Sequence, residues 1–428
     1  MNRVVVVGAS AGGLATAESL RRLGFSGDLT LVGAEASPPY DRPPLSKQIL
    51  TGELTAAQVE LRSAEQLDEL ALDLRLGVEA TGVDLATRRL STTKGAIGYD
   101  ALVVATGVRP RSLPGATGAS GVHFVRTLDD ALGLKESLQP GQRLVVVGAG
   151  FIGAETAAVA RSLGVEVTML EPEPVPLARA LGEQVGLAFG ALHREHGVDL
   201  RTEVAVREIL NDGSRVTGVR TAEGGVVPAD AVVVGIGSVP NVEWLQGSGL
   251  SLGDGLLCDE FSRAAPDVYG VGDVARWTNP LFGVSMRIEH RTNAAEQGLA
   301  VARNLLEPGA GKPFAPVPYF WSDQYDRKLQ AYGYLRDHDE IAVVAGDLRS
   351  PSFVAAYRKG EVLTGVVAGN AGPKVLRGWR AAIARQQPWR DVEAGPGQLD
   401  ARSGGAGAAR TGGAQLRTVD RMQRPGVF

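Results

Sequence analysis

The chain has 428 residues, of which 44% are apolar and 21% are charged, and its formal net charge is -4. This length exceeds what one hydrophobic core usually holds, so we expect two or three domains of ordinary globular composition. The negative net charge argues against bulk attraction to nucleic acid or to anionic lipid, so any partner surface must be a local patch.

The single cysteine, Cys258, limits the redox chemistry of the chain itself. One thiol cannot form an internal disulfide, which excludes the reductases that pass two electrons through a cysteine pair. It also cannot hold an iron-sulfur cluster or a thiolate zinc site, so we expect no metal. Of the two roles open to Cys258, a buried strand residue and a nucleophile, we expect the first. The N-terminal residues lack the features of a signal peptide and no apolar run is bilayer-long, so we expect a cytoplasmic location and no membrane contact.

Short β-branched runs alternate with helical stretches in two successive groups. The first group has expected strands at 3–7, 29–32 and 101–105 and a helix at 14–23. The second has a strand at 143–147, an Ala-rich helix ending at 163 and a strand at 166–170. This alternation of strands and helices predicts βαβ units with parallel sheets, and therefore two nucleotide-binding domains.

The pattern changes after residue 322. Short strands are expected at 328–334, 340–345, 352–358 and 362–368, followed by an Arg-rich helix from Pro373. We interpret this region as a third, α+β domain. Residues 394–428 are dominated by Gly, Ala and Arg, which predicts a disordered tail.

The first expected strand runs into an incomplete dinucleotide fingerprint. Gly8 and Gly13 hold the outer positions of GxGxxG, whereas Ser10 replaces the middle glycine and Gly12 adds flexibility. The turn presents a helix N-terminus that attracts phosphate, and Glu35 follows the second strand, where a carboxylate accepts from ribose hydroxyls. A merely tight strand-to-helix turn is the alternative interpretation.

The second fingerprint is intact. Gly148, Gly150 and Gly153 are followed by Glu171 at the end of the next strand. A carboxylate there binds the ribose diol and repels a 2′-phosphate, which favours NADH over NADPH. Two fingerprints in one chain predict two adenine dinucleotides, with a permanently bound FAD in the first site and NADH as the visitor in the second.

The segment PPYDRPPLSK at 38–47 resembles the FAD-binding signature of the ferredoxin and rubredoxin reductases that serve bacterial oxygenases. Four further blocks agree with that family: DALVVATGVRPR at 100–111, VRTLDDA at 125–131, VYGVGDVA at 268–275 and VPYFWSDQYDRKLQ at 317–330. The resemblance covers nearly the whole chain to about residue 390 and implies a glutathione-reductase-like α/β fold. The order of the motifs places the FAD-binding domain at 1–113 and 243–322, around an NAD-binding domain at 114–242, with a C-terminal α+β domain at 323–393.

The resemblance also implies roles for particular residues. Lys47 would lie against the flavin, paired with Glu155, where an ammonium stabilises negative charge as hydride arrives. Gly237 would border the nicotinamide pocket, although a Gly-rich turn after a buried strand needs no ligand. The remaining residues assigned to the FAD side are Arg42, Ala105, Thr106, Gly107, Arg126, Gly272, Asp273 and Trp321.

In one block the sequence departs from the family pattern. Arg291 stands where the family usually has a tryptophan near the flavin edge that faces ferredoxin, so neither the electron-exit geometry nor the identity of the partner can be taken from the family here. Arg291 could instead offer an acidic ferredoxin a direct charge contact. The C-terminal helix region is basic, which fits a ferredoxin landing surface or an ordinary solvated face equally well; its cations are Lys374, Arg377, Arg380, Arg385 and Arg390.

The implied function is electron transfer from NADH through FAD to a 2Fe-2S or related ferredoxin, which would feed a haem-thiolate monooxygenase or a Rieske oxygenase. One alternative is an NADH oxidase or peroxidase on the same scaffold, which would need a redox cysteine facing the flavin. Another is a sensor that resembles apoptosis-inducing factor, in which NADH binding changes dimerisation. Ferredoxin-dependent turnover separates the reductase from both.

Overall fold

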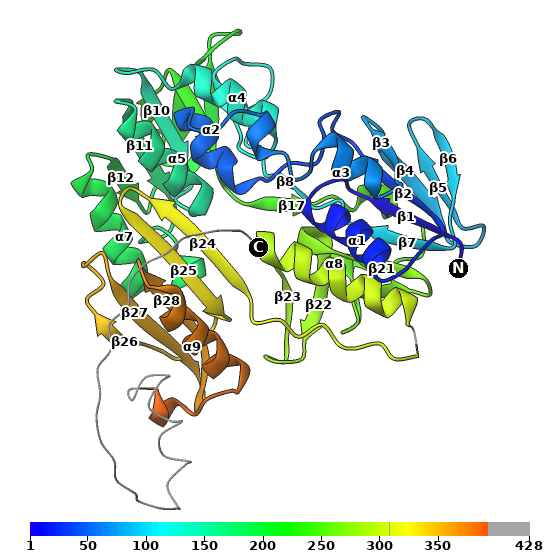
Figure 1. The fold of residues 1–428 in the computed structure, drawn as a ribbon. Helices are drawn as coiled ribbons and strands as arrows, with labels where there is room; N and C mark the ends of the chain where they lie inside the picture. The colour runs from blue at the N-terminus through cyan, green and yellow to red at the C-terminus, as the bar shows by residue number, and fades with distance from the viewer. Residues whose placement is uncertain (308, 393–428) are drawn as a thin grey trace, which may run out of the picture.

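The structure, a computed structural model, describes residues 1–307 and 309–392. The chain forms two dinucleotide units and a C-terminal unit, which lie around a central junction (Figure 1). The segment 394–428, expected to be disordered, lies outside the described residues. Within the part of the chain that is described, no helix is both long and apolar enough to cross a bilayer.

The first unit is built on a sheet with the strand order β20-β21-β7-β1-β2-β3, in which only β20 runs antiparallel to its neighbour. Helices α1 and α8 pack against each other and share an apolar core with one face of β1. The elements are β1 (Arg3–Val7), α1 (Ala11–Arg22), β2 (Asp28–Gly33), α3 (Ala64–Glu69), β3 (Asp73–Leu76), β7 (Ala101–Val104), β20 (Arg263–Ala265), β21 (Val268–Gly270) and α8 (Arg291–Leu306).

Two small sheets complete the first unit. One has the order β4-β5-β6 and packs Leu90 and Ile97 on the opposite face of β1. The other has the order β18-β19-β22-β23 and contributes the buried Trp277. Their bounds are β4 (Ala80–Asp84), β5 (Arg89–Thr92), β6 (Gly95–Gly98), β18 (Leu252–Gly253), β19 (Gly255–Leu257), β22 (Ala275–Asn279) and β23 (Val284–Arg287).

The second unit repeats the plan of the first with a parallel sheet in the order β12-β11-β10-β16-β9. An antiparallel sheet, β13-β14-β15, packs its apolar side chains on one face of β10 and β16. The elements are β9 (Val122–His123), α4 (Leu128–Ser137), β10 (Arg143–Val147), α5 (Phe151–Ser162), β11 (Glu166–Glu171), α6 (Ala178–Leu181), α7 (Glu183–Glu195), β12 (Asp199–Thr202), β13 (Val206–Asn211), β14 (Val216–Thr221), β15 (Val226–Pro228) and β16 (Ala231–Val234).

A two-stranded ribbon joins the two dinucleotide units. Strand β8 (Val108–Pro110) leaves the first unit and β17 (Ser238–Pro240) returns to it, and the two pair in antiparallel register. The second unit therefore lies, in sequence, between two parts of the first.

The C-terminal unit is an antiparallel sheet with the order β24-β25-β28-β27-β26 and one helix, α9, packed on β25 and β28. The strands expected from the sequence are present to within one residue, but β24 was not expected. Because β24 belongs to this sheet, the expected division at residue 322 falls inside a strand, and the sheet itself begins at Tyr319. The bounds are β24 (Tyr319–Gln324), β25 (Arg327–Gly333), β26 (Glu340–Gly346), β27 (Phe353–Lys359), β28 (Val362–Gly369) and α9 (Pro373–Ala384).

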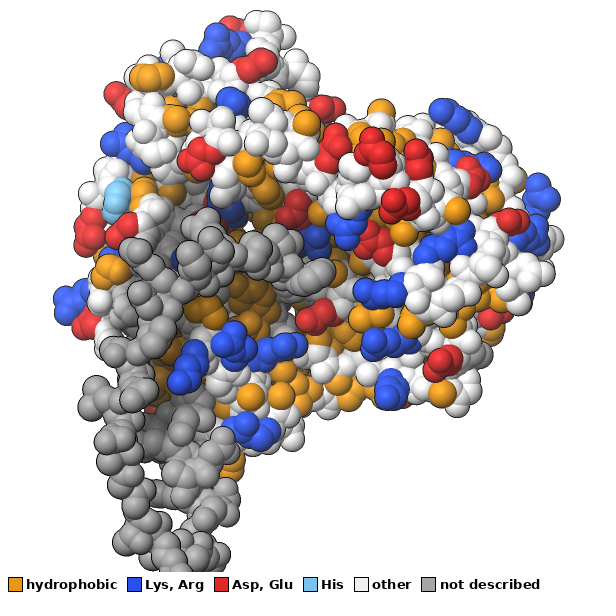
Figure 2. Space-filling model, viewed as in Figure 1, with side chains coloured by type: hydrophobic (Ala, Val, Ile, Leu, Met, Phe, Trp, Pro, Cys, Tyr) orange, Lys and Arg blue, Asp and Glu red, His pale blue; other side chains and the backbone are white. Residues whose placement is uncertain are grey.

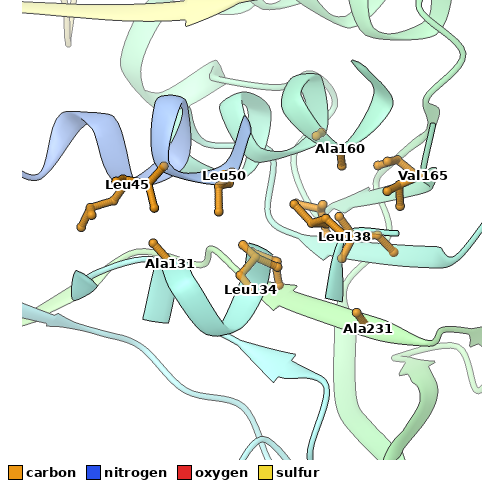
Figure 3. Close-up of a cluster of buried hydrophobic side chains, with 14 of the residues drawn as sticks. Leu45, Leu50, Ala131, Leu134, Leu138, Ala160, Val165 and Ala231 are labelled. Atoms are coloured by element: carbon orange, nitrogen blue, oxygen red, sulfur yellow. The ribbon is translucent and has the colours of Figure 1, made fainter. Parts of the chain in front are cut away.

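One hydrophobic cluster joins the two dinucleotide units directly. Leu45 and Leu50, which flank Lys47 on a 3-10 turn (Pro43–Ser46) and on α2 (Gln48–Thr51), point toward Leu134 of α4 (Figure 3). All three side chains are buried. The Pro-stiffened segment that carries Lys47 is thus anchored on the core of the second unit, although it belongs to the first unit in sequence.

We expect Leu134→Ala to lower the free energy of unfolding by about 2–5 kcal/mol, because it removes buried methyl groups from a core that cannot collapse fully. Leu132→Ala, on the exposed face of the same helix, is the matched control. Urea denaturation of both variants measures the difference. Equal, small shifts in the two midpoints would show that this cluster does not stabilise the junction.

Candidate functional site

The two fingerprint turns have the same local geometry. The first glycine of each has a positive φ, 117° at Gly8 and 96° at Gly148. A Cβ on Gly8 would lie 2.1 Å from the carbonyl oxygen of Ala105, and one on Gly148 would lie 2.5 Å from that of Gly235. Each turn therefore approaches the end of the neighbouring parallel strand so closely that only glycine fits.

The remaining positions of the fingerprints differ in what they face. A Cβ on Gly13 or Gly153 would collide with the carbonyl oxygen of the first glycine of its own turn. A Cβ on Gly150 would meet no atom within 4 Å, which leaves open space at the helix N-terminus where a pyrophosphate can approach. Ser10 occupies the corresponding position with an extended backbone that any residue adopts, so the replacement causes no strain.

Arg42 brings the two ends of the first fingerprint together. Its guanidinium donates to Glu35 at 2.6 Å and lies 3.4 Å from the hydroxyl of Ser10, with a further bond of 3.1 Å to Tyr40. Burial acts to lower the pKa of Arg42, but the charges of Tyr40 and Glu35 outweigh burial and raise that pKa. The result is a cation fixed between the phosphate turn and the residue expected to hold the ribose.

A second cation lies close to the first, because Arg42 donates a hydrogen bond to the backbone carbonyl of Arg126. Arg126 pairs with Asp273 at 3.2 Å, and a Cβ on Gly107 would lie 3.0 Å from the same guanidinium. Burial raises the pKa of Asp273, and the charge of Arg126 opposes that rise. Gly272 donates its N–H to the buried Gln297, a contact that the sequence did not indicate.

Lys47 and Glu155 form a buried ion pair between the two units. The ammonium lies 2.8 Å from Oε2 of Glu155, and only 9% of Lys47 and 3% of Glu155 are exposed. The 3-10 turn presents the lysine from one side, and the first turns of α5 present the glutamate from the other. The structure thus brings together the two residues that the family resemblance pairs.

Two residues expected near the flavin engage other parts of the chain. The hydroxyl of Thr106 donates to the carbonyl of Asn241, whose side chain donates back to the carbonyl of Thr106 at 3.0 Å. Thr106 therefore ties the end of β7 to the linker ribbon. Trp321 stacks on Tyr319 with ring centroids 5.9 Å apart, both on β24.

The carboxylate of Glu171 lies across the second phosphate turn. It accepts from the backbone N–H of Ala149 at 2.6 Å and from that of Glu173 at 3.0 Å. A cation does stand nearby, because Arg179 pairs with Glu173 at 2.5 Å; the sequence did not reveal it, since Arg179 is brought close by α6. Gly237 lies where β16 leads into the linker ribbon, and its carbonyl accepts from Arg111.

Arg291 does not present a free charge. It begins α8 and pairs with Asp41, which belongs to the same Pro-rich segment as Arg42. The side chains remain about one-quarter and one-third exposed. The residue that replaces the family tryptophan thus connects α8 with the loop that carries Lys47.

The five cations expected on the C-terminal helix region are all exposed. Lys374, Arg377 and Arg380 lie on α9, and Figure 2 shows Lys and Arg side chains gathered over this part of the face. Arg380 also pairs with Glu296 of α8 at 3.7 Å. This pairing connects the basic surface to the first unit.

Three aromatic side chains at the junction were missed by the sequence analysis. Phe320 of β24 lies between Phe151 of α5 and His290, with ring centroids 4.9 Å away in each case. Burial lowers the pKa of His290 to about 4, and the charge of Arg336 acts in the same direction. Phe151 directly follows Gly150 of the second fingerprint, and Phe320 directly precedes Trp321. This adjacency to two motifs is the sequence feature that could have identified the two phenylalanines as junction residues.

Cys258 has the properties of an inert thiol. It lies one residue past β19 and is only partly buried by its neighbours, so the expectation of a buried strand position was wrong by one residue. Burial of the sulfur nonetheless raises the pKa of Cys258 to about 12, and its Sγ lies 3.5 Å from the carbonyl oxygen of Leu256. A thiol with this pKa is not a nucleophile at neutral pH.

These features define a class of protein. Two glycine cradles, each at the end of a parallel sheet, fit two dinucleotides, and the buried lysine-glutamate pair lies at the junction between them. The fold and the site therefore define a two-dinucleotide flavoprotein oxidoreductase.

Comparison with known proteins gives the family. Residues 2–298 match the model for "Pyridine nucleotide-disulphide oxidoreductase", and residues 319–401 match the model for "Reductase C-terminal". The chain belongs to the pyridine nucleotide-disulphide oxidoreductase family, and the expected fold class is confirmed.

Individual relatives support the expected resemblance to ferredoxin reductases. The chain is 38% identical to the rhodocoxin reductase of Rhodococcus erythropolis over 401 residues, which is 93% of each chain. It is 38% identical over 336 residues to the ferredoxin-NAD(+) reductase component of the p-cumate 2,3-dioxygenase system of Pseudomonas putida, covering 78% of this chain and 81% of that one. The solved covalent putidaredoxin reductase-putidaredoxin complex matches with a TM-score of 0.88 and 33% identity, covering 95% of this chain and 99% of that one.

The sequence predicts that the Glu171 carboxylate binds the ribose diol of NADH, so we expect Glu171→Ala to raise the KM for NADH about tenfold through loss of a charge-assisted hydrogen bond. Discrimination against NADPH should relax at the same time, because the carboxylate that would repel a 2′-phosphate is gone. Steady-state kinetics with both coenzymes measures the change, and Glu173→Ala alone is the control that frees Arg179 without removing the discriminating carboxylate. Unchanged coenzyme preference in Glu171→Ala would refute this role.

Proposed function

We propose that this protein is an FAD-dependent NADH:ferredoxin oxidoreductase whose 2Fe-2S or related ferredoxin feeds a monooxygenase or a Rieske oxygenase. The observation that carries the proposal is the buried Lys47-Glu155 pair at the junction of the two glycine cradles. The names of the relatives and the solved complex with putidaredoxin support ferredoxin as the acceptor.

In this proposal the residues hold and orient the cofactors. The hydride acceptance and the release of single electrons are chemistry that the bound flavin supplies. Arg42 and the turn at Gly8 bind phosphate, Asp273 accepts from the ribityl chain, and Glu171 binds the ribose of NADH. Lys47, held in place by Glu155, stabilises the negative charge that develops as hydride arrives.

The properties of Cys258 bear on the cellular location and on the competing oxidase or peroxidase function. We place the protein in the cytoplasm, where NADH is supplied and a lone thiol stays reduced. An oxidase or peroxidase would need a reactive cysteine beside the flavin, whereas burial raises the pKa of Cys258 to about 12. No side-chain nucleophile takes part in the proposed reaction.

The test is anaerobic stopped-flow mixing of the purified holoprotein with NADH, followed by cytochrome c reduction with and without an acidic 2Fe-2S ferredoxin. We expect rapid bleaching of the flavin band by NADH and cytochrome c reduction only when ferredoxin is added. Lys47→Ala should slow the bleaching on the order of tenfold or more while FAD stays bound. Bleaching over minutes, together with a change in oligomeric state, would favour an NADH sensor instead.

The Arg291-Asp41 pair generates a prediction about the acceptor. Arg291→Gln leaves the Asp41 carboxylate bare and should raise the KM for an acidic ferredoxin about two- to fivefold, whereas Asp41→Asn should lower it by a similar factor. The double variant should return close to the wild-type value, because the pair contributes little net charge. Measurements at two salt concentrations check the electrostatic origin, and effects of the same sign in both single variants would contradict it.

A further inference from the structure

The carboxylate of Glu155 receives hydrogen bonds from two units besides its own. Oε2 accepts from the hydroxyl of Ser46 at 2.5 Å and from the ammonium of Lys47 at 2.8 Å, both in the first unit. Oε1 accepts from the hydroxyl of Ser322 at 2.8 Å and from the backbone N–H of Asp323 at 3.2 Å, both at the end of β24. Neither serine was singled out by the sequence, and both are at most 1% exposed.

The bonds continue away from Glu155 into the C-terminal unit and back to the second unit. The amide nitrogen of Gln324 donates to the hydroxyl of Ser322 at 3.1 Å, and its oxygen lies 3.1 Å from Nε2 of His193 on α7. Nδ1 of His193 lies 2.9 Å from the hydroxyl of Tyr325. Gln324 and His193 are fully buried, so these bonds do not compete with bulk water.

The chemistry of these groups fixes which partner donates in each bond of this hydrogen-bond chain. An amide oxygen only accepts, so Nε2 of His193 carries the proton and Nδ1 accepts from Tyr325. Burial lowers the pKa of His193 to about 4, which keeps the ring neutral at pH 7. The amide of Gln324 then occupies one lone pair of the hydroxyl of Ser322, whose own hydrogen is left to point at Glu155.

We propose that Ser322, Gln324 and His193 are positioning residues of the hydride site, which orient the Glu155 carboxylate and through it the ammonium of Lys47. The inference rests on the proposed function of the Lys47-Glu155 pair. A carboxylate with donors on both oxygens has one favoured orientation. That orientation in turn fixes the position of an ammonium that is hydrogen-bonded to the carboxylate. This hydrogen-bond chain orients its groups and does not conduct protons, because the Gln324 amide in the middle of it does not exchange protons readily with its neighbours.

The first experiment compares Ser322→Ala with Ser322→Thr in the FAD-loaded protein. The alanine variant should lower the limiting rate of flavin reduction on the order of fivefold, as expected for the loss of one positioned hydrogen bond. The apparent Kd for NADH should stay within about twofold of the wild type, because no contact to the coenzyme is removed. The flavin midpoint potential should become more negative, and the threonine variant, which keeps the hydroxyl, should restore the rate and the potential.

A second pair of variants covers the case in which position 322 does not tolerate change. His193→Gln keeps a donor where Nε2 lies and should behave as the wild type, whereas His193→Leu should shift the potential in the same direction as Ser322→Ala. Tyr357→Phe is the matched control, because the buried hydroxyl of Tyr357 joins the same two units through the carbonyl of Leu181 at 2.6 Å, outside the chain. It should lower the thermal midpoint of unfolding without changing the potential.

Two outcomes would overturn the inference. If Ser322→Ala and His193→Leu lower stability as Tyr357→Phe does but leave the rate and the potential unchanged, the chain only joins the units. If Lys47→Ala also leaves both quantities unchanged, the proposed role of the ion pair itself fails. A large effect in Lys47→Ala without one in Ser322→Ala refutes the positioning role alone.

Discussion

The organisation of this molecule depends on one carboxylate, that of Glu155, which is buried where all three units meet. An isolated buried carboxylate is costly, but each oxygen here has two donors, those to Oε2 from residues 46–47 and those to Oε1 from residues 322–323. Loss of any one segment would leave part of that charge unsatisfied, so the three units are coupled at the same point at which the two glycine cradles converge. The requirements of folding and of the proposed chemistry coincide at this residue.

Hydrophobic packing next to the ion pair also stabilises this junction. Leu45 and Leu50 hold the segment that carries Lys47 on the core of the second unit, and the proline residues of that segment limit its conformations. The ion pair of Asp41 with Arg291 fastens the other end of the segment to α8. The irregular segment that carries Lys47 is therefore held at both ends, which restricts the position of the lysine.

Local pattern was enough to predict much of the fold, because β1 and β10 are short, continuous β-branched and aliphatic runs that lead directly into glycines. Strand β24 was missed because its half-buried aromatic run does not alternate clearly. The pairing of Lys47 with Glu155 came from family resemblance, whereas the parts played by Ser322 and Asp41 depend on contacts across 167 and 250 residues. No sequence period reports such contacts. The basic character of α9 was visible, but its ion pair with Glu296 was not.

The shared core of Leu45, Leu50 and Leu134 also bears on how the chain matures. The second unit is an insertion in sequence, yet residues from before the insertion complete its apolar core, so part of that core would be missing from the second unit alone. During synthesis the segment around Leu50 emerges roughly eighty residues ahead of α4, a delay on the order of ten seconds at typical elongation rates. We therefore expect these leucines to lack their packing partners until α4 has emerged, which favours transient binding of the nascent first unit by chaperones.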